Sequence, residues 1–101
     1  MSAGVIAKKN DELRSKLPVL PWPHKLVLSS GVAALSTVEI GSAITSIKEY
    51  NNFTEENDPY KEHDCIIVGG FICKIDYYAD NYEEFKEDGN RVFTIMKSYE
   101  Y

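Results

Sequence analysis

The chain has 101 residues, 44% of them hydrophobic, which suits one folded domain with a single modest core. Its 11 basic and 16 acidic residues give a net charge of −5. This charge disfavours nonspecific binding to duplex nucleic acid, because phosphate contacts need clustered Lys and Arg. It is compatible with binding a basic protein surface, or it serves solubility alone.

Targeting signals and cysteines indicate the cellular setting. Lys8 and Lys9 are not followed by the apolar run of a secretory signal, and no stretch approaches the ~18 apolar residues of a membrane span. We therefore expect a cytoplasmic protein in a reducing compartment, whose two cysteines need not be bonded. No membrane partner and no cofactor are expected.

The first expected helix covers residues 3–17, where Ile6, Leu13 and Leu17 lie close to one helical face and Pro18 ends the pattern.

Residues 18–24, PVLPWPH, cannot be helical and predict an extended connector. The indole of Trp22 either packs on the core or stays exposed for a partner, and core packing is the expectation. Residues 25–29 resemble a short strand that Gly31 closes.

Two further helices are expected from apolar residues at i, i+3, i+4 and i+7. The first begins after an N-cap at Ser36 or Thr37 and ends near Tyr50. Its apolar positions are Ile40, Ala43, Ile44 and Ile47. The second follows a break at residues 88–90 and uses Val92, Ile95, Met96 and Tyr99.

Two β-rich segments flank Gly69-Gly70, which predicts a two-residue hairpin turn. In the resulting register Cys65 and Cys73 point to opposite faces, so we expect no disulfide between them. Cys65 would lie beside Lys74, a neighbour that favours its thiolate.

The same register sets His63 opposite Asp76 as a candidate charge-assisted pair. Such a pair would orient the imidazole for general base catalysis, with water, Cys65, Ser29 or Ser30 as the nucleophile. The alternative is a solvated pair that only stabilises the hairpin. His63 and Asp76 are the candidate catalytic residues.

Residues 57–60, NDPY, predict a turn, because Asn and Asp side chains cap backbone groups and Pro fixes one φ angle. The functional alternative uses Asp58 and Tyr60 as ligand contacts on a rigid loop.

Glu62, His63 and Asp64 follow one another where a strand begins, so Glu62 and Asp64 would share one side and His63 the other. A zinc site is not expected, because His24 is the only other histidine and no Cys-x-x-Cys pair is present. A magnesium-type site of Asp58, Glu62 and Asp64 stays open, without a specific signal for it.

Lys74, Asp76 and Tyr78 share one face of the second hairpin strand. They form either the wet face of an antiparallel sheet or a set that binds a nucleotide-like or other polar ligand. A Gly-rich phosphate-binding loop is absent from the sequence.

Several longer motifs lie in the second half of the chain: Phe53-Thr54, Asn57-Asp58-Pro59-Tyr60, Glu62-His63-Asp64, Lys74-Ile75-Asp76-Tyr77-Tyr78, Arg91-Val92, Thr94-Ile95-Met96 and Glu100-Tyr101. With them the chain resembles a small bacterial family known only as a domain of unknown function, common on proteobacterial plasmids and other mobile elements. The resemblance implies that residues 57–78 form one unit, and it implies no reaction.

The chain departs from that resemblance in three places. Family members tend to continue Glu-His-Asp with Phe-Gly, where this chain has Cys65-Ile66, and to carry Trp at the position of Cys73. They also have a longer Asp/Pro-rich loop over residues 81–90, so a site built partly from that loop would be altered here. Residues 29–32, Ser-Ser-Gly-Val, look like the family's Thr-Pro-Gly-Val turn.

These patterns together predict a single α+β domain of order α-β-α-β-β-α, with a three-stranded, mostly antiparallel sheet covered by helices on one face. The exposed face would display His63, Lys74 and Asp76 beside the turn at residues 57–62. Small sheets with one open face often bury it against a second copy, so a homodimer is expected.

The expected function is that of a small, acidic, non-enzymatic binding or inhibitor protein of mobile-element type that interferes with a host system, for example in anti-defence. It would sequester a nucleotide-like ligand or occlude a basic surface of a host protein. The alternatives are a small hydrolase or lyase that uses His63 with Asp76 or Glu62, and a toxin–antitoxin or regulatory component. No metal is assigned, and the expected ligand contacts are Asp58, Tyr60, Glu62, His63, Asp64, Lys74, Asp76, Tyr78 and Arg91.

Overall fold

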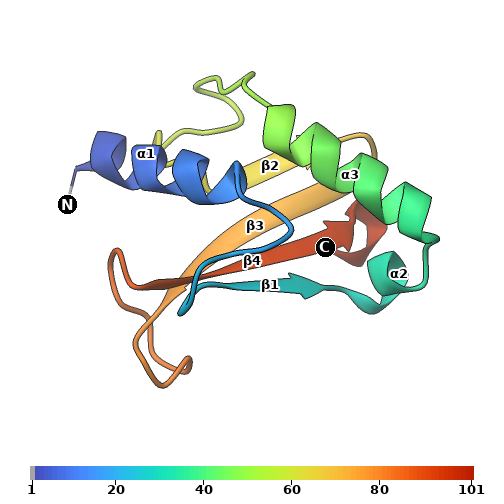
Figure 1. Ribbon diagram of the computed structural model, residues 1–101. Helices are drawn as coiled ribbons and strands as arrows, with labels where there is room; N and C mark the ends of the chain where they lie inside the picture. Colours follow the sequence, from blue (N-terminus) through green and yellow to red (C-terminus); the bar gives the residue numbers. More distant parts are fainter. Residues whose placement is uncertain (1) are drawn as a thin grey trace.

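A computed structural model describes residues 2–101 and shows helices on one side of a β-sheet (Figure 1). In chain order the elements are α1 (Ala3–Arg14), β1 (Lys25–Leu28), α2 (Ser30–Ala33), α3 (Thr37–Glu49), β2 (Cys65–Val68), β3 (Phe71–Tyr78), β4 (Asn90–Lys97) and a 3-10 turn (Ser98–Glu100). The α+β class is therefore confirmed.

The sheet has four strands in the order β1-β4-β3-β2. β2 pairs with β3 and β3 with β4 in antiparallel fashion, whereas β1 runs parallel to β4. The last strand in the sequence therefore lies inside the sheet, between the first strand and the hairpin.

Local sequence signals place several elements correctly. Ser36 caps α3 in a capping box with Glu39, as its position before the apolar pattern predicted. The hairpin turns at Gly69 and Gly70, both with positive φ, and pairs Val68 with Phe71 in the predicted register. The two cysteines are free, as expected.

The C-terminal helix and the three-stranded sheet were wrong, because residues 90–97 form strand β4. Val92, Ile95 and Met96 match a helical spacing, but burial alternates with a period of two: Arg91, Phe93 and Ile95 are buried and the residues between them are not. Val, Phe, Thr and Ile all favour strands, and both neighbouring strands hydrogen-bond to this segment.

The prediction that Trp22 packs on the core was also wrong. Its side chain is 82% exposed, and the neighbouring Val19 is exposed as well. The connector is instead held near β1 through Pro23, whose carbonyl accepts a hydrogen bond from the Tyr82 hydroxyl.

The core lies between the helices and the face of the sheet that carries Ile66, Cys73, Ile75, Phe93 and Ile95. The helices contribute Leu13 from α1, Val32 from α2, and Ile44 and Ile47 from α3. Within residues 2–101, none of the helices has the length and apolar character needed to cross a membrane.

A buried arginine connects the two long helices. The Nη1 atom of Arg14, near the end of α1, donates to the carbonyl oxygens of Ile47, Lys48 and Tyr50 at 2.7, 3.1 and 2.9 Å. Ile47 and Lys48 belong to the last turn of α3, and Tyr50 is its C-cap. Ile47 also accepts the Tyr50 backbone N–H, so Arg14 adds to a weak cap contact at the carbonyl end of the helix and complements the negative end of the helix dipole.

Replacement of Phe93 tests the assignment of residues 90–97 as a strand. Phe93→Ala should lower the free energy of unfolding by about 3–5 kcal/mol, because the ring is fully buried in the core. The neighbouring Val92 points to the opposite face, so Val92→Ala should cost about 1 kcal/mol or less. Urea unfolding of both variants measures the difference, and equal losses would contradict the alternation.

Candidate functional site

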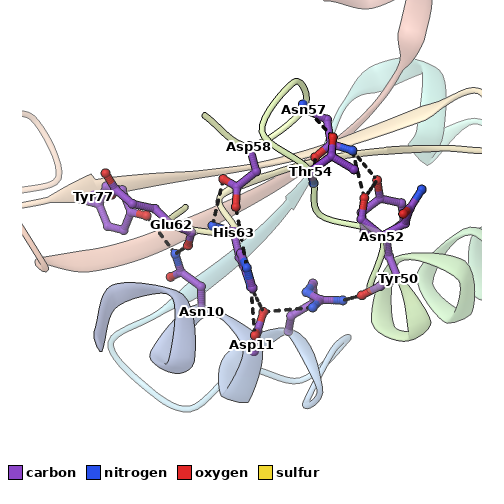
Figure 2. Close-up of polar contacts among 11 residues, drawn as sticks. Asn10, Asp11, Tyr50, Asn52, Thr54, Asn57, Asp58, Glu62, His63 and Tyr77 are labelled. Atoms are coloured by element: carbon purple, nitrogen blue, oxygen red, sulfur yellow. Dashed lines mark hydrogen bonds and ion pairs between the residues drawn. The ribbon is translucent and has the colours of Figure 1, made fainter. Parts of the chain in front are cut away.

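The NDPY segment is a turn held by its own side chains, as predicted. The Asn57 side-chain oxygen accepts from the Thr54 backbone N–H at 2.8 Å, and its amide donates to the Asn52 carbonyl at 2.9 Å (Figure 2). Asp58 is almost fully buried, and its Oδ1 atom accepts the backbone N–H of His63 at 3.2 Å. Tyr60 points outward and is exposed.

His63 contacts α1 and not the sheet. Its Nδ1 atom lies 3.0 Å from both carboxylate oxygens of Asp11, and its Nε2 atom lies 3.6 Å from Oδ2 of Asp58 (Figure 2). The ring stacks on Phe53 with centroids 3.8 Å apart and planes 3° from parallel. Both ring nitrogens therefore face carboxylates of the protein itself.

The predicted pair of His63 with Asp76 was wrong. The backbone of His63 has a positive φ of 55°, so this residue does not extend strand β2, which begins at Cys65. Asp76 is on the face of β3 that no helix covers and pairs with Lys74, with Nζ 3.4 Å from Oδ2. His63 is therefore also absent from the open face on which it was expected.

Glu62 and Asp64 point away from His63 and line a different part of the surface. A cavity of about 340 Å³ contains both carboxylates together with Tyr77, and a second cavity of about 360 Å³ shares Asp64, Tyr77 and Phe85 with it. We call the lining of the two cavities the acidic groove. Its polar and aromatic residues are Glu62, Asp64, Asp76, Tyr77, Tyr78, Glu83, Phe85, Glu87 and Asp88.

The acidic groove combines negative charge with aromatic surface. Six of the nine residues just named are carboxylates, and neither cavity is lined by a Lys or Arg among the described residues. Phe85 is 74% exposed and meets the Tyr77 ring edge to face, with centroids 6.5 Å apart. Such a surface suits an organic cation with apolar stem and charged head.

The surroundings of Asp64 and Glu62 in the groove disfavour the charged form of both carboxyl groups. Burial raises the pKa of Asp64 above its ordinary value, against the lowering effect of a hydrogen bond from the Tyr77 hydroxyl at 3.3 Å. The pKa of Glu62 is also raised, first by burial and then by Asp64 and Asp58. Two carboxylates in this position favour a nearby cation.

A buried arginine, Arg91, is connected to the groove residues by hydrogen bonds and an ion pair. Arg91 has an exposed fraction of 0%, its Nη2 atom lies 2.5 Å from Oδ1 of Asp88, and its Nε donates to Oδ1 of Asn10 at 2.9 Å. The Asn10 amide in turn donates to the Tyr77 hydroxyl at 2.8 Å and to the Glu62 carbonyl at 2.9 Å (Figure 2). Arg91, an expected ligand contact, thus lies beneath the surface.

The environment of Cys65 differs from the expected one. Burial raises the pKa of its thiol, and Asp64 raises it further, while Lys74 acts in the opposite direction. The thiolate is therefore not favoured, although Lys74 is the cross-strand partner that the register predicted.

The remaining side of the 53–63 segment forms a separate cavity of about 400 Å³, lined by Phe53, Thr54, Glu55, Asp58, Lys61 and His63. Within residues 2–101, no group of three His, Cys, Asp or Glu side chains lies close enough together to hold a metal ion. The magnesium-type set fits this geometry poorly, because Asp58 and Glu62 line different cavities.

Several residues of this region could not be assigned from the sequence. Asn10 and Asp11 belong to α1 and meet residues 52 or more positions away. Phe85 gave a weak signal, as the one aromatic residue between Glu83-Glu84 and Lys86-Glu87. A large apolar side chain inside a charged run is a candidate for an exposed contact.

The fold and groove define a small α+β domain with an acidic, aromatic surface on one side of a mixed sheet. A family model described as "Protein of unknown function (DUF3768)" matches residues 28–100. The chain belongs to this family. The match covers the whole acidic groove apart from Ile6, and it begins after α1. Neither the curated proteins nor the solved structures contain a significant match.

Arg91→Met should lower the free energy of unfolding by about 3–5 kcal/mol, because it leaves the Asp88 carboxylate and the Asn10 side chain without their buried partner. Lys86→Met, which removes an exposed cation from the same segment, should change stability by less than about 0.5 kcal/mol. Arg91→Met with Asp88→Asn should recover part of the loss. A loss below about 1 kcal/mol in Arg91→Met alone would argue against the network.

Asp64→Asn should stabilise the protein at neutral pH. The pKa of Asp64 is raised in the folded state, so the folded protein binds the proton more tightly and stability falls as pH rises above the ordinary value of 3.8. In the variant the free energy of unfolding should not fall in this way, and at pH 7 it should exceed that of the unchanged protein by ~0.5 kcal/mol. The difference is small because solvent screens the half-exposed carboxylate. Urea unfolding from pH 4 to pH 7 measures it, and a variant that is less stable at pH 7 would contradict the argument.

Proposed function

We propose that the protein is a small binding protein that occludes a basic surface of another protein through the acidic groove. The observation that carries the proposal is the lining of the groove, with six carboxylates beside Tyr77, Tyr78 and Phe85 and no lining Lys or Arg among the described residues. Shape and charge together favour a cationic side chain of a partner.

The groove offers each part of a Lys or Arg side chain a suitable contact. The aliphatic stem can pack on the exposed face of Phe85, and the charged head can reach the carboxylates of Glu62 or Asp64. Contact with an aromatic ring adds cation–π attraction, and Arg forms charge-assisted hydrogen bonds with carboxylates. A bound cation would also relieve the penalty that burial imposes on the Asp64 charge.

The lining supports the basic-surface function over the sequestration of a nucleotide-like ligand. Phosphate groups carry the same sign of charge as the carboxylates of the groove, and like charges brought together repel. Lys74, the cation expected to face such a ligand, is engaged by Asp76. An acidic protein that mimics the charge of nucleic acid would instead compete for a nucleic-acid-binding surface.

The hydrolase or lyase alternative receives less support from the geometry. It was based on His63 paired with Asp76 or Glu62, and both ring nitrogens of His63 face Asp11 and Asp58. A binding role needs no such pair. In the biological context that the family resemblance implies, the partner would be a cytoplasmic host protein, and its inhibition would serve a mobile element, for example in anti-defence.

Binding of a labelled deca-arginine peptide tests the groove directly. Fluorescence anisotropy should detect saturable binding at low salt that weakens steeply as salt rises, because the contacts are ionic. Asp64→Asn with Asp76→Asn should weaken binding by roughly tenfold, which corresponds to ~1.4 kcal/mol. Phe85→Ala should weaken it further by loss of the aromatic contact.

The matched control is Glu55→Gln with Glu56→Gln, which removes the same charge from two exposed positions outside the groove. This variant should bind the peptide nearly as well as the unchanged protein. Equal weakening in both double variants would show that net charge alone attracts the peptide, and that outcome would sink the proposal.

A further inference from the structure

Among the helices of residues 2–101, none packs on the second face of the sheet. Helices α1, α2 and α3 all contribute to a single core cluster, on the face that carries Phe93 and Ile95 (Figure 1). Residues in register across a sheet share a face, so the partners of Val92, Thr94 and Met96 lie together on the other side. We call this side the open face.

The open face consists of transverse rows of side chains. The first row, Ile67, Ile72 and Met96, is entirely apolar. The second row is Cys65, Lys74, Thr94 and Val27, and the third is Asp76, Val92 and Lys25. Apolar side chains thus run from one edge strand to the other.

The exposure of these side chains shows that the apolar row is incompletely covered. Ile67 is 60% exposed and Val27 is 45% exposed. Ile72, between them in the sheet, is buried but does not belong to the core cluster. Contiguous apolar surface on a sheet face is the usual place for a partner to pack.

The open face lacks the excess negative charge of the chain, which suits a second copy of the chain as the partner. The three rows carry Lys25, Lys74 and Asp76, a net charge of +1 on a chain of −5. Two copies that meet here avoid the repulsion between their acidic surfaces. A two-fold axis that passes close to Lys74 and Asp76, which lie 3.4 Å apart within one chain, would set each lysine opposite the carboxylate of the other copy.

The available area is sufficient for a reversible dimer. Two strands of eight residues and two of four, with a rise of about 3.3 Å per residue and a spacing of about 4.8 Å, cover roughly 400 Å² of plane. Protruding side chains on two such faces would bury on the order of 1,000 Å² in total, at the lower end for specific interfaces.

We propose that the open face is the interface of a homodimer, in which the Ile67–Ile72–Met96 row of each copy packs on the open face of the other. The open face shares Asp76 with the acidic groove, but the dimer does not require the basic-surface function, and Ile67 and Val27, the residues that test it, lie outside the groove.

Sedimentation velocity over a concentration series, from about 5 to about 500 µM, tests the dimer. The unchanged chain should shift with concentration from 11.5 kDa to twice that mass. Ile67→Asp and Val27→Asp place unpaired charges at opposite ends of the face. Each should raise the protein concentration at which half of the dimer is dissociated by at least tenfold. Both positions are exposed, so circular dichroism should show an unchanged fold.

Val38→Asp is the matched control, because Val38 is an exposed valine on α3, on the helical side of the sheet. It should dimerise as the unchanged chain does. A monomer throughout the series for the unchanged chain would overturn the proposal. Dimers that survive both open-face substitutions, or that Val38→Asp also dissociates, would assign the interface to another surface and overturn it as well.

Discussion

The structure depends most on one buried charge, the guanidinium of Arg91 in strand β4, beside Tyr77 of strand β3. A buried cation is tolerated only where partners satisfy it, and here Asp88, the Gly89 carbonyl and Asn10 do so from two directions. Asn10 belongs to α1, so the first helix is attached to the last strand by polar contacts as well as by packing. The same network positions Tyr77 and the backbone at Glu62, which form the floor and wall of the acidic groove.

The side chains of residues 62–64 point in two directions, one toward the helix α1 and the other toward the acidic groove. His63 turns toward α1 and joins Asp11, Asp58 and Phe53 in a cluster that holds the preceding loop to the helix. Glu62 and Asp64 turn the other way and face solvent in the groove. His63 therefore stabilises the fold, whereas its neighbours Glu62 and Asp64 line the groove. The positive φ of His63 is the local backbone change that turns its side chain away from theirs.

Local signals predicted local structure well. The Ser36 cap and the Gly69-Gly70 turn each depend on neighbouring residues, so a short window of sequence contains the necessary information. Strand β4 was mispredicted because its apolar positions match two periodicities, and only the neighbouring strands distinguish them. The partners of His63 and Arg91 lie 52 and 81 positions away, beyond any pattern in the chain.

The position of β4 within the sheet has a consequence for synthesis of the protein. Of the four described strands, β4 is synthesised after the other three, yet it occupies an inner position and supplies the only strand partner of β1 in the described sheet. A nascent chain that ends before residue 90 can form the β2–β3 hairpin and its helices, but it must leave β1 unpaired and much of the core uncovered. Folding of the domain therefore waits for its C-terminal residues, and until then the chain exposes apolar surface that chaperones recognise.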